Sequence, residues 1–247
     1  MEVANAQGSL LSGGDSAEAG YSTAARAAWT ALARGRRSTR RFLDKAVPEA
    51  WLEEMLAEAR CAPSGANLQP GEVISVESAA RERLSGMLVD AYRGRTPARD
   101  DYSYFPNPMP MTLRRRQVAA AQALYGALGA AREDQLARSA QFERNFRFFD
   151  APIALVITID NRLGSGCFMD LGMCLYGIML AAAARGLGSC AIGALASYPQ
   201  IVREALGLES GHSIVCGLAI GYADPLALEN GIRTERRDVS NFLRIAC

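Results

Sequence analysis

Four short segments rich in valine and isoleucine are spread along most of the chain, and each is bounded by turn residues. They are residues 71–77, 151–160, 188–194 and 213–222. Their β-branched content and their length predict strands. The connections between them are long and do not follow a regular strand–helix alternation. The sequence therefore predicts an α+β sandwich that forms one domain, without internal repeats.

Helical periodicity dominates the rest of the chain. Residues 22–35 and 48–60 carry apolar side chains at helical spacing, with a glycine ending the first and a proline opening the second. Residues 167–186 are apolar nearly throughout, but they contain Asp170 and Arg185 and are barely long enough to cross a bilayer. A buried central helix is favoured there over a membrane anchor.

The connection between the first two strands is a long insertion. Residues 100–110 contain three prolines and cannot stay helical, whereas residues 113–129 and 132–149 return to helical period. These features predict a helical lid over about residues 95–148.

The two ends of the chain lack a clear hydrophobic period. Residues 1–22 have neither a basic start nor a long apolar stretch, so they predict a flexible tail and not a secretory signal. Residues 223–247 are expected to run over the surface or onto another subunit. The folded domain is therefore expected to span residues 23–247.

Charge and cysteine usage exclude several classes of function. The chain has 27 Lys and Arg against 26 Asp and Glu, so no bulk field favours nucleic acid or an anionic membrane, and any basic site must be local. Six cysteines without a CxxC pair, and a single histidine, do not form a zinc pattern. They are expected to be reduced thiols in a cytoplasmic protein rather than disulfides.

Two arginine clusters stand near opposite ends of the chain. Residues 36–41 read RRSTRR, after an expected helix end, and residues 233–238 read RTERRD. Guanidinium forks beside hydroxyl groups can converge on phosphate oxygens. A solvated basic turn is the other interpretation of each cluster taken alone.

Two further segments combine glycine with polar groups. In residues 62–71, APSGANLQPG, two prolines stiffen a loop whose side chains can read the edge of a heterocycle, although a plain helix-to-strand connection has the same composition. Residues 185–195, RGLGSCAIGAL, bring backbone N–H groups near a ligand or allow close packing of a helix on a strand. They do not match GxGxxG, which argues against a Rossmann site.

Taken in order, the four segments resemble the FMN-dependent nitroreductase family. Its signatures RRSxRxF, APSxxNxQP, GLGxxxIG and NxxRTERxxxxxF stand here as RRSTRRF, APSGANLQP, GLGSCAIG and NGIRTERRDVSNF. The resemblance covers about residues 27–244 and is strongest to the branch that reduces nitroaromatic compounds such as nitrobenzoates. It implies an α/β/α sandwich, with a central mostly antiparallel sheet flanked by helices. It also implies an intertwined homodimer with FMN at the interface and a C-terminal tail that embraces the partner.

The resemblance also implies how FMN is held. The phosphate and ribityl oxygens would be bound by Arg36, Arg37 and Ser38, with Arg40 near O2 of the ring, where positive charge favours reduced FMN. The residues approaching from the neighbouring subunit would be Pro63, Ser64, Gly65 and Asn67. Main-chain contact near flavin N5 would come from Ile192 and Gly193. The late arginines Arg233 and Arg236 would close on the phosphate.

The function implied is reduction of nitroaromatic or quinone-like acceptors by ping-pong hydride transfer from NADPH or NADH through flavin N5. Because the cofactor carries the chemistry, no protein acid, base or nucleophile is assigned, and no metal is expected. One alternative is a flavin-dependent dehydrogenase or oxidase that acts on a biosynthetic intermediate with O2 as acceptor. Another is a non-catalytic flavin-binding sensor.

Two residues depart from the family pattern, and one aromatic group has no fixed role. Gly71 stands where an aromatic residue is usual, and Tyr176 stands where glutamine is common, so the identity of the substrate stays open. An aromatic set could roof the flavin or belong to an ordinary core. Its members are Tyr102, Tyr104, Phe105, Phe148 and Phe149.

Overall fold

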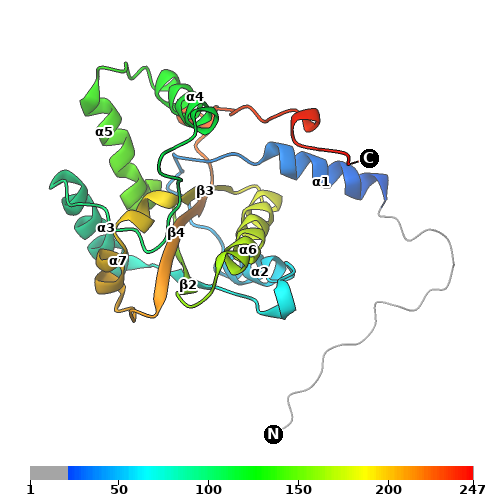
Figure 1. The fold of residues 1–247 in the computed structure, drawn as a ribbon, viewed down its shortest axis with the longest axis horizontal. Coiled ribbons are helices and arrows are strands. Elements are labelled where there is room, and N and C mark those ends of the chain that lie inside the picture. The colour runs from blue at the N-terminus through cyan, green and yellow to red at the C-terminus, as the bar shows by residue number, and fades with distance from the viewer. Residues whose placement is uncertain (1–21, 247) are drawn as a thin grey trace, which may run out of the picture.

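A computed structural model describes residues 22–246, which form a four-stranded antiparallel sheet with helices on both faces (Figure 1). The flexible tail predicted for residues 1–22 lies, apart from Ser22, outside the described residues. The strands are β1 (Glu72–Ser75), β2 (Ile153–Asp160), β3 (Gly188–Ile192) and β4 (His212–Gly221), in the order β1-β2-β4-β3. Each neighbouring pair is antiparallel. All four predicted strands, and the α+β class, are confirmed.

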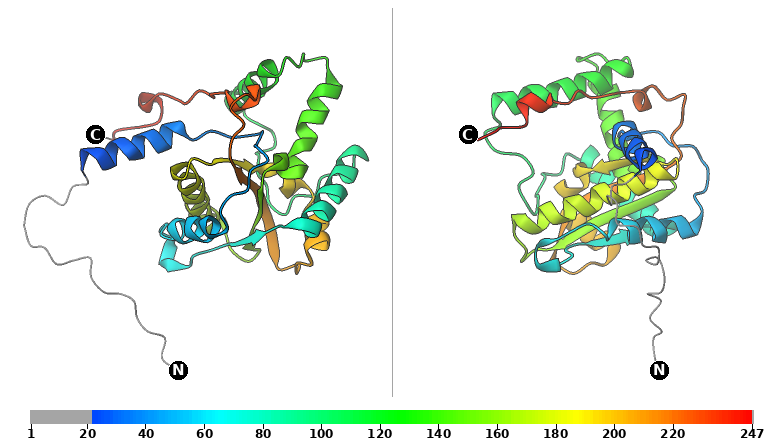
Figure 2. Two further views of the ribbon diagram at one scale, coloured as in Figure 1. Left: turned by 180° about the vertical axis from the view of Figure 1, so that it is seen from behind. Right: turned by 90° about the vertical axis from the view of Figure 1, so that its right-hand side faces the viewer.

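Alternate side chains of the central strands are buried on opposite faces of the sheet, as the two-residue period of a strand requires. On β2, Leu155 and Ile157 face one layer of helices, and Val156 faces the other. The first layer holds α2 (Glu49–Ala59) and α6 (Ser165–Ala184), and the second holds α3 (Ser78–Arg93) and α7 (Pro199–Leu206). Figure 2 shows the two layers from behind and from the side. The three-layer sandwich is the predicted architecture.

Helix α6 is buried along one side only. Leu171, Ile178 and Ala182 pack into the core, whereas Met169 is 66% exposed and Met173 and Tyr176 are each 38% exposed. By length and composition α6 could cross a membrane, but it lies along the sheet and packs against α2. The prediction of a buried helix is therefore half right: its apolar outer stripe lacks a cover among the described residues.

The insertion contains the two helices that the sequence predicts, although the second is shorter. Helices α4 (Met111–Ala127) and α5 (Gln135–Glu143) match the two predicted lid helices. The second ends earlier than predicted, at Glu143, where a 3₁₀ segment, η2 (Arg144–Asp150), begins; Phe148 and Phe149 within it have left-handed conformations. Both rings are fully buried, so they are core aromatics and do not roof a ligand.

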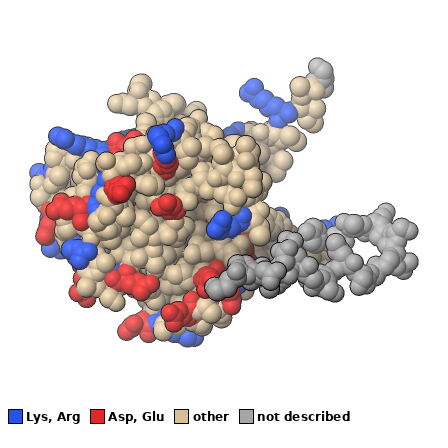
Figure 3. Space-filling model, turned by 90° about the horizontal axis from the view of Figure 1, so that it is seen from below, with Lys and Arg blue, Asp and Glu red and all other residues tan. Residues whose placement is uncertain are grey.

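Helix α1 (Thr23–Gly35) and the C-terminal tail leave the body of the molecule together (Figures 1 and 2). Ser22 caps α1, with its Oγ accepting a hydrogen bond from the amide of Ala25 at 3.1 Å. The helix buries none of its residues, and the tail exposes large apolar side chains such as Phe242, 79% exposed. On the face seen in Figure 3, acidic and basic side chains are interspersed.

Candidate functional site

The two arginine clusters, almost two hundred residues apart in sequence, line one cavity of about 460 Å³. The first cluster and the end of α1 form one wall, the start of the C-terminal tail forms another, and Tyr176 of α6 completes the lining. The predicted residues that the cavity brings together are Arg36, Arg37, Ser38, Arg40, Arg233 and Arg236. Arg34 adds a sixth guanidinium. The cavity is therefore strongly positive, although the chain as a whole is nearly neutral.

The first cluster is held against the edge of the sheet at β3. The amide of Thr39 donates to the carbonyl of Ser189 at 3.0 Å, and Ser38 forms a parallel bridge with the same residue. A Cβ added at Gly188 would lie 2.3 Å from Oγ1 of the buried Thr39. Only glycine leaves room for this contact, so Gly188 in the GLG segment serves close packing of the arginine turn on the strand.

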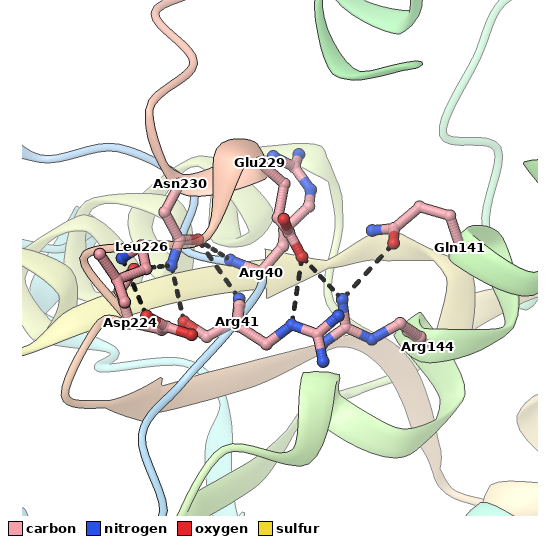
Figure 4. Close-up of polar contacts among 8 residues, drawn as sticks. All are labelled: Arg40, Arg41, Gln141, Arg144, Asp224, Leu226, Glu229 and Asn230. Carbon is pink, nitrogen blue, oxygen red and sulfur yellow. Dashed lines mark hydrogen bonds and ion pairs between the residues drawn. The ribbon is translucent and has the colours of Figure 1, made fainter. Parts of the chain in front are cut away.

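Asn230 fixes the backbone of the arginine turn (Figure 4). Its Oδ1 accepts from the amides of Arg40 at 2.8 Å and Arg41 at 3.2 Å. Its Nδ2 donates to the carbonyls of Arg41 at 2.7 Å and Asp224 at 3.0 Å. The side chain is 2% exposed. One amide thus uses both of its ends to join the arginine turn to the start of the C-terminal tail.

Glu229, beside Asn230 in the short helix η4 (Leu228–Asn230), joins the turn to the end of the lid. Its Oε1 lies 3.3 Å from Nε of Arg41 and 3.0 Å from Nη1 of Arg144, and the carboxylate is 4% exposed (Figure 4). Burial lowers the pKa of Arg144, whereas the bond to Glu229 raises it. The two arginines surround one buried carboxylate, which is the arrangement that makes such a burial tolerable.

Arg37 has an unmet hydrogen-bond donor. Its Nε is buried and has no partner among the described residues. A buried donor without a partner costs free energy, and a guanidinium prefers an oxyanion. The residues of the arginine cavity therefore fit a phosphate group.

The loop of residues 61–71 lines a different cavity, of about 470 Å³, between α2, α6 and β1. Pro63 and Ser64 belong to its lining, and the amide of Gly65 donates to the buried Oδ2 of Asp170 at 3.0 Å. Asn67 is exposed in a left-handed conformation, with φ of 56°. Within one chain these four residues do not line the arginine cavity.

Gly71 ends this loop with no space for a side chain. Its φ is +94°, and a Cβ there would lie 2.5 Å from Cδ1 of Leu171 and 3.1 Å from the carbonyl oxygen of Thr158. Leu171 of α6 packs so closely against the loop that the aromatic residue usual at this position would not fit.

We expect Gly71→Ala to lower the free energy of unfolding by about 2 kcal/mol, because the new methyl group meets both strain and a clash. The measurement is the urea midpoint of the folded protein. Gly86→Ala, in the middle of α3 with nothing within 4 Å of its new Cβ, is the matched control and should raise the midpoint slightly. Equal midpoints for the two variants would contradict the packing argument.

Ile192 and Gly193 lie at the end of β3, where the 3₁₀ segment η3 (Gly193–Ser197) begins. Ile192 is buried, and Gly193 is exposed. The nearest neighbour of a Cβ added at Gly193 would be Cε2 of Tyr104, at 3.9 Å. The backbone at this strand end is thus open to a ligand and faces the aromatic loop of residues 102–105.

The thiols near the site are not nucleophiles. Burial raises the pKa of Cys190, on β3, although Arg40 acts in the opposite direction. Burial also raises the pKa of Cys216, on β4, to about 12. Both therefore stay protonated near neutral pH. The five cysteines within residues 22–246 are free of disulfides.

Sequence reasoning missed several residues that shape these cavities. Asn230 and Glu229 lie shortly before the RTER segment. Asn230 is the first residue of the motif NGIRTER, and its place in that motif is the sequence signal that could have identified it. Tyr176 was seen only as a departure from a pattern. The function of Asp170 as acceptor for the loop had no signal beyond a lone carboxylate in an apolar helix.

Comparisons with known proteins agree with this geometry. The model of the nitroreductase family matches residues 33–222. The chloronitrobenzene nitroreductase of Comamonas testosteroni is 36% identical, over 85% of this chain and 93% of that protein. The 4-nitrobenzoate reductase of Pseudomonas putida is 31% identical, over 86% of this chain and 92% of that protein.

A solved structure has the same fold. It is the FMN-dependent nitroreductase NfnB from Mycobacterium smegmatis in complex with NADPH, with a TM-score of 0.85 and 32% sequence identity. The similarity covers 90% of this chain and all of that one.

Proposed function

The chain belongs to the nitroreductase family, and from this premise we propose that it is an FMN-dependent oxidoreductase that passes hydride from NAD(P)H to nitroaromatic acceptors. The observation that carries the proposal is the arginine cavity, which is lined by guanidinium groups from both ends of the chain. The relatives named for chloronitrobenzene and 4-nitrobenzoate support the class of acceptor.

The arginine cavity is proposed to hold the FMN phosphate. Arg37 supplies the unpaired Nε, and Arg36 and Ser38 lie beside it in the same turn. Arg236 is exposed, and among residues 22–246 its guanidinium donates only through Nη1, to Thr234 and the carbonyl of Glu235, which leaves its other donors for an oxyanion. Arg233 donates to the carbonyl of Arg34 at 2.9 Å and so ties the tail to the cavity.

The end of β3 is proposed to meet the flavin ring. The exposed backbone at Gly193 suits main-chain contact, and Ile192 packs beneath it in the core. Arg40 is placed by Asn230 and puts positive charge where the reduced ring becomes negative. When bound, FMN supplies the hydride-accepting position N5. The chain needs no nucleophile of its own, which suits the protonated thiols nearby.

A homodimer is proposed to complete the site. The outer stripe of α6 is apolar yet exposed, and the C-terminal tail carries exposed apolar side chains such as Phe242. Large exposed apolar patches mark interaction surfaces. A second copy covering α6 would bring Pro63, Ser64, Gly65 and Asn67 toward the first copy's cofactor, which accounts for their distance from the arginine cavity in one chain.

The proposed donor is NADPH, because the M. smegmatis relative was crystallised with it. NADPH is abundant in the cytoplasm, where thiols also stay reduced, and a cytoplasmic location is proposed on that ground. The lid of residues 95–148 remains a proposed cover for the acceptor.

The test is the absorbance of the purified protein during anaerobic titration. We expect a flavin spectrum that NADPH bleaches and that nitrobenzene then restores, because both substrates use the same cofactor in turn. Identification of the released chromophore as FMN completes the measurement. Bleaching by an organic metabolite but not by NADPH would favour the dehydrogenase alternative, and a flavin that no donor bleaches would favour the sensor.

A further inference from the structure

The aromatic loop is anchored at its base and free at its tip. The amide of Arg99 donates to the carbonyl of Ser197 at 3.0 Å, and the hydroxyl of Tyr102 donates to the carbonyl of Val215 at 2.7 Å. The tip residue Tyr104 is 61% exposed. The loop thus contacts η3 through Arg99 and β4 through Tyr102, and it returns to the solvent at Tyr104.

The strongest anchor is an ion pair between Asp101 and Arg203. Their side chains are 15% and 10% exposed, and Oδ2 of Asp101 accepts from Nη2 of Arg203 and, at 2.9 Å, from the amide of Ile214. Arg203 also donates to the carbonyl of His212, at 3.2 Å from Nε and 2.9 Å from Nη2. Arg203 of α7 therefore binds both the start of β4 and the base of the loop.

The anchored base leads directly to the tip. The ring of Tyr102 lies 5.1 Å from that of Phe168 on α6 and 6.3 Å from that of Tyr104. Tyr104 in turn lies 4.7 Å from Phe105 and is the nearest neighbour of the open backbone at Gly193. A row of four aromatic rings thus connects α6 to the strand end where the flavin ring is proposed to lie.

The stability of the fold does not by itself explain this ion pair. A buried ion pair stabilises a fold little more than apolar residues of the same shape would, because desolvation offsets the attraction. What it does provide here is a fixed direction for the loop. A loop held in its binding conformation binds its ligand more tightly, since less conformational entropy is lost on binding.

We propose that Asp101 and Arg203 are positioning residues that hold Tyr104 beside Gly193 and thereby set the affinity for the aromatic acceptor. The proposal rests on the proposed function, because the acceptor is taken to stack near the flavin. Neither residue touches the acceptor. Both act through the orientation of Tyr104, whose ring can stack on a flat aromatic compound.

The first variant is Asp101→Asn, which keeps an oxygen for Ile214 but removes the charge that Arg203 grips. With nitrobenzene as acceptor, we expect KM to rise about tenfold, as for the loss of one charge-assisted hydrogen bond, with kcat within about twofold. The affinity for FMN should not change. Trypsin should cleave after Arg99 several times faster, because the loop base is released. Arg203→Lys, a milder change that loses the guanidinium fork, should shift KM in the same direction by less.

Two controls separate positioning from general structure. Glu58→Gln weakens the ion pair with Arg185, which lies between α2 and α6 and away from the loop, and should leave KM and cleavage after Arg99 unchanged. In a Tyr104→Ala background, Asp101→Asn should no longer change KM, since its effect passes through that ring. An undiminished effect in this background, or an unchanged rate of cleavage after Arg99, would overturn the proposal.

The outcome for the loop is separable from the outcome for the proposed function. If the unaltered protein holds no flavin or is not reduced by NADPH, the proposed function fails. The trypsin comparison of Asp101→Asn with Glu58→Gln still reports whether the ion pair holds the loop, because it needs no activity.

Discussion

Arg37→Met is expected to weaken the binding of FMN by about 10–100-fold, the range for losing a charge-assisted hydrogen bond to a charged ligand. Its affinity for riboflavin, which lacks the phosphate, should change little. The reason is the position of Arg37 in a cavity with five other guanidinium groups, where its buried Nε has no partner in the part of the chain that the structure describes. The measurement is the quenching of flavin fluorescence by the apoprotein, with each ligand in turn.

The matched control is Arg26→Met, on the exposed surface of α1 and outside the cavity. It removes the same charge from the same region and should leave both affinities unchanged. High salt should weaken FMN binding by the unaltered protein more than riboflavin binding, because phosphate recognition is electrostatic. Equal losses of both ligands in Arg37→Met would place Arg37 in the fold and not in phosphate recognition.

The sheet was predictable because its signal is local. Each strand is a run of β-branched residues ended by turn residues, and all four were located to within a few residues. Helix α3 was left unassigned inside the insertion, although Leu84 and Leu88 show a helical spacing and both are fully buried. The early end of the second lid helix was not predictable, since the helical period of the sequence continues to Phe149, whereas the backbone changes to a 3₁₀ segment at Arg144.

The apolar composition of helix α6 predicts that it is buried but does not identify what covers it. A helix that is apolar all round is expected to be buried, but composition does not say by what. The structure buries one face against the sheet and α2 and leaves Met169 and Tyr176 exposed. A cover for this face is what the proposed dimer would supply.

The site was predictable only in part, because its two halves are distant in sequence. Residue types left an anion site and a solvated turn open at each arginine cluster, and only the family resemblance brought residues 36–41 and residues 233–236 to one phosphate. That contact depends on Gly188, which lets the first cluster approach β3, and on Asn230, which joins it to the tail. Neither residue lines the arginine cavity, so a search for binding side chains passes over both.

Asn230→Ala is accordingly expected to be the most damaging single change at the site. It removes four part-buried hydrogen bonds and leaves the amides of Arg40 and Arg41 without their acceptor. Each such group costs free energy, and we expect the free energy of unfolding to fall by about 3 kcal/mol, which lowers Tm by roughly 6–12 °C in a protein of this size. FMN affinity should fall as well, because the arginine turn is released.

Two further variants are to be compared with Asn230→Ala. Asn161→Ala removes one exposed hydrogen bond, to the carbonyl of Ser210 at 3.2 Å, and should lower the free energy of unfolding by less than about 1 kcal/mol. Asn230→Asp keeps the acceptor for both amides but cannot donate to the carbonyls of Arg41 and Asp224, so its stability should be intermediate. Thermal unfolding with and without FMN measures both effects. If Asn230→Ala were as stable as Asn161→Ala and bound FMN normally, the other contacts of the arginine turn, such as those of Thr39 with β3 and of Arg41 with Glu229, would be sufficient to fix it.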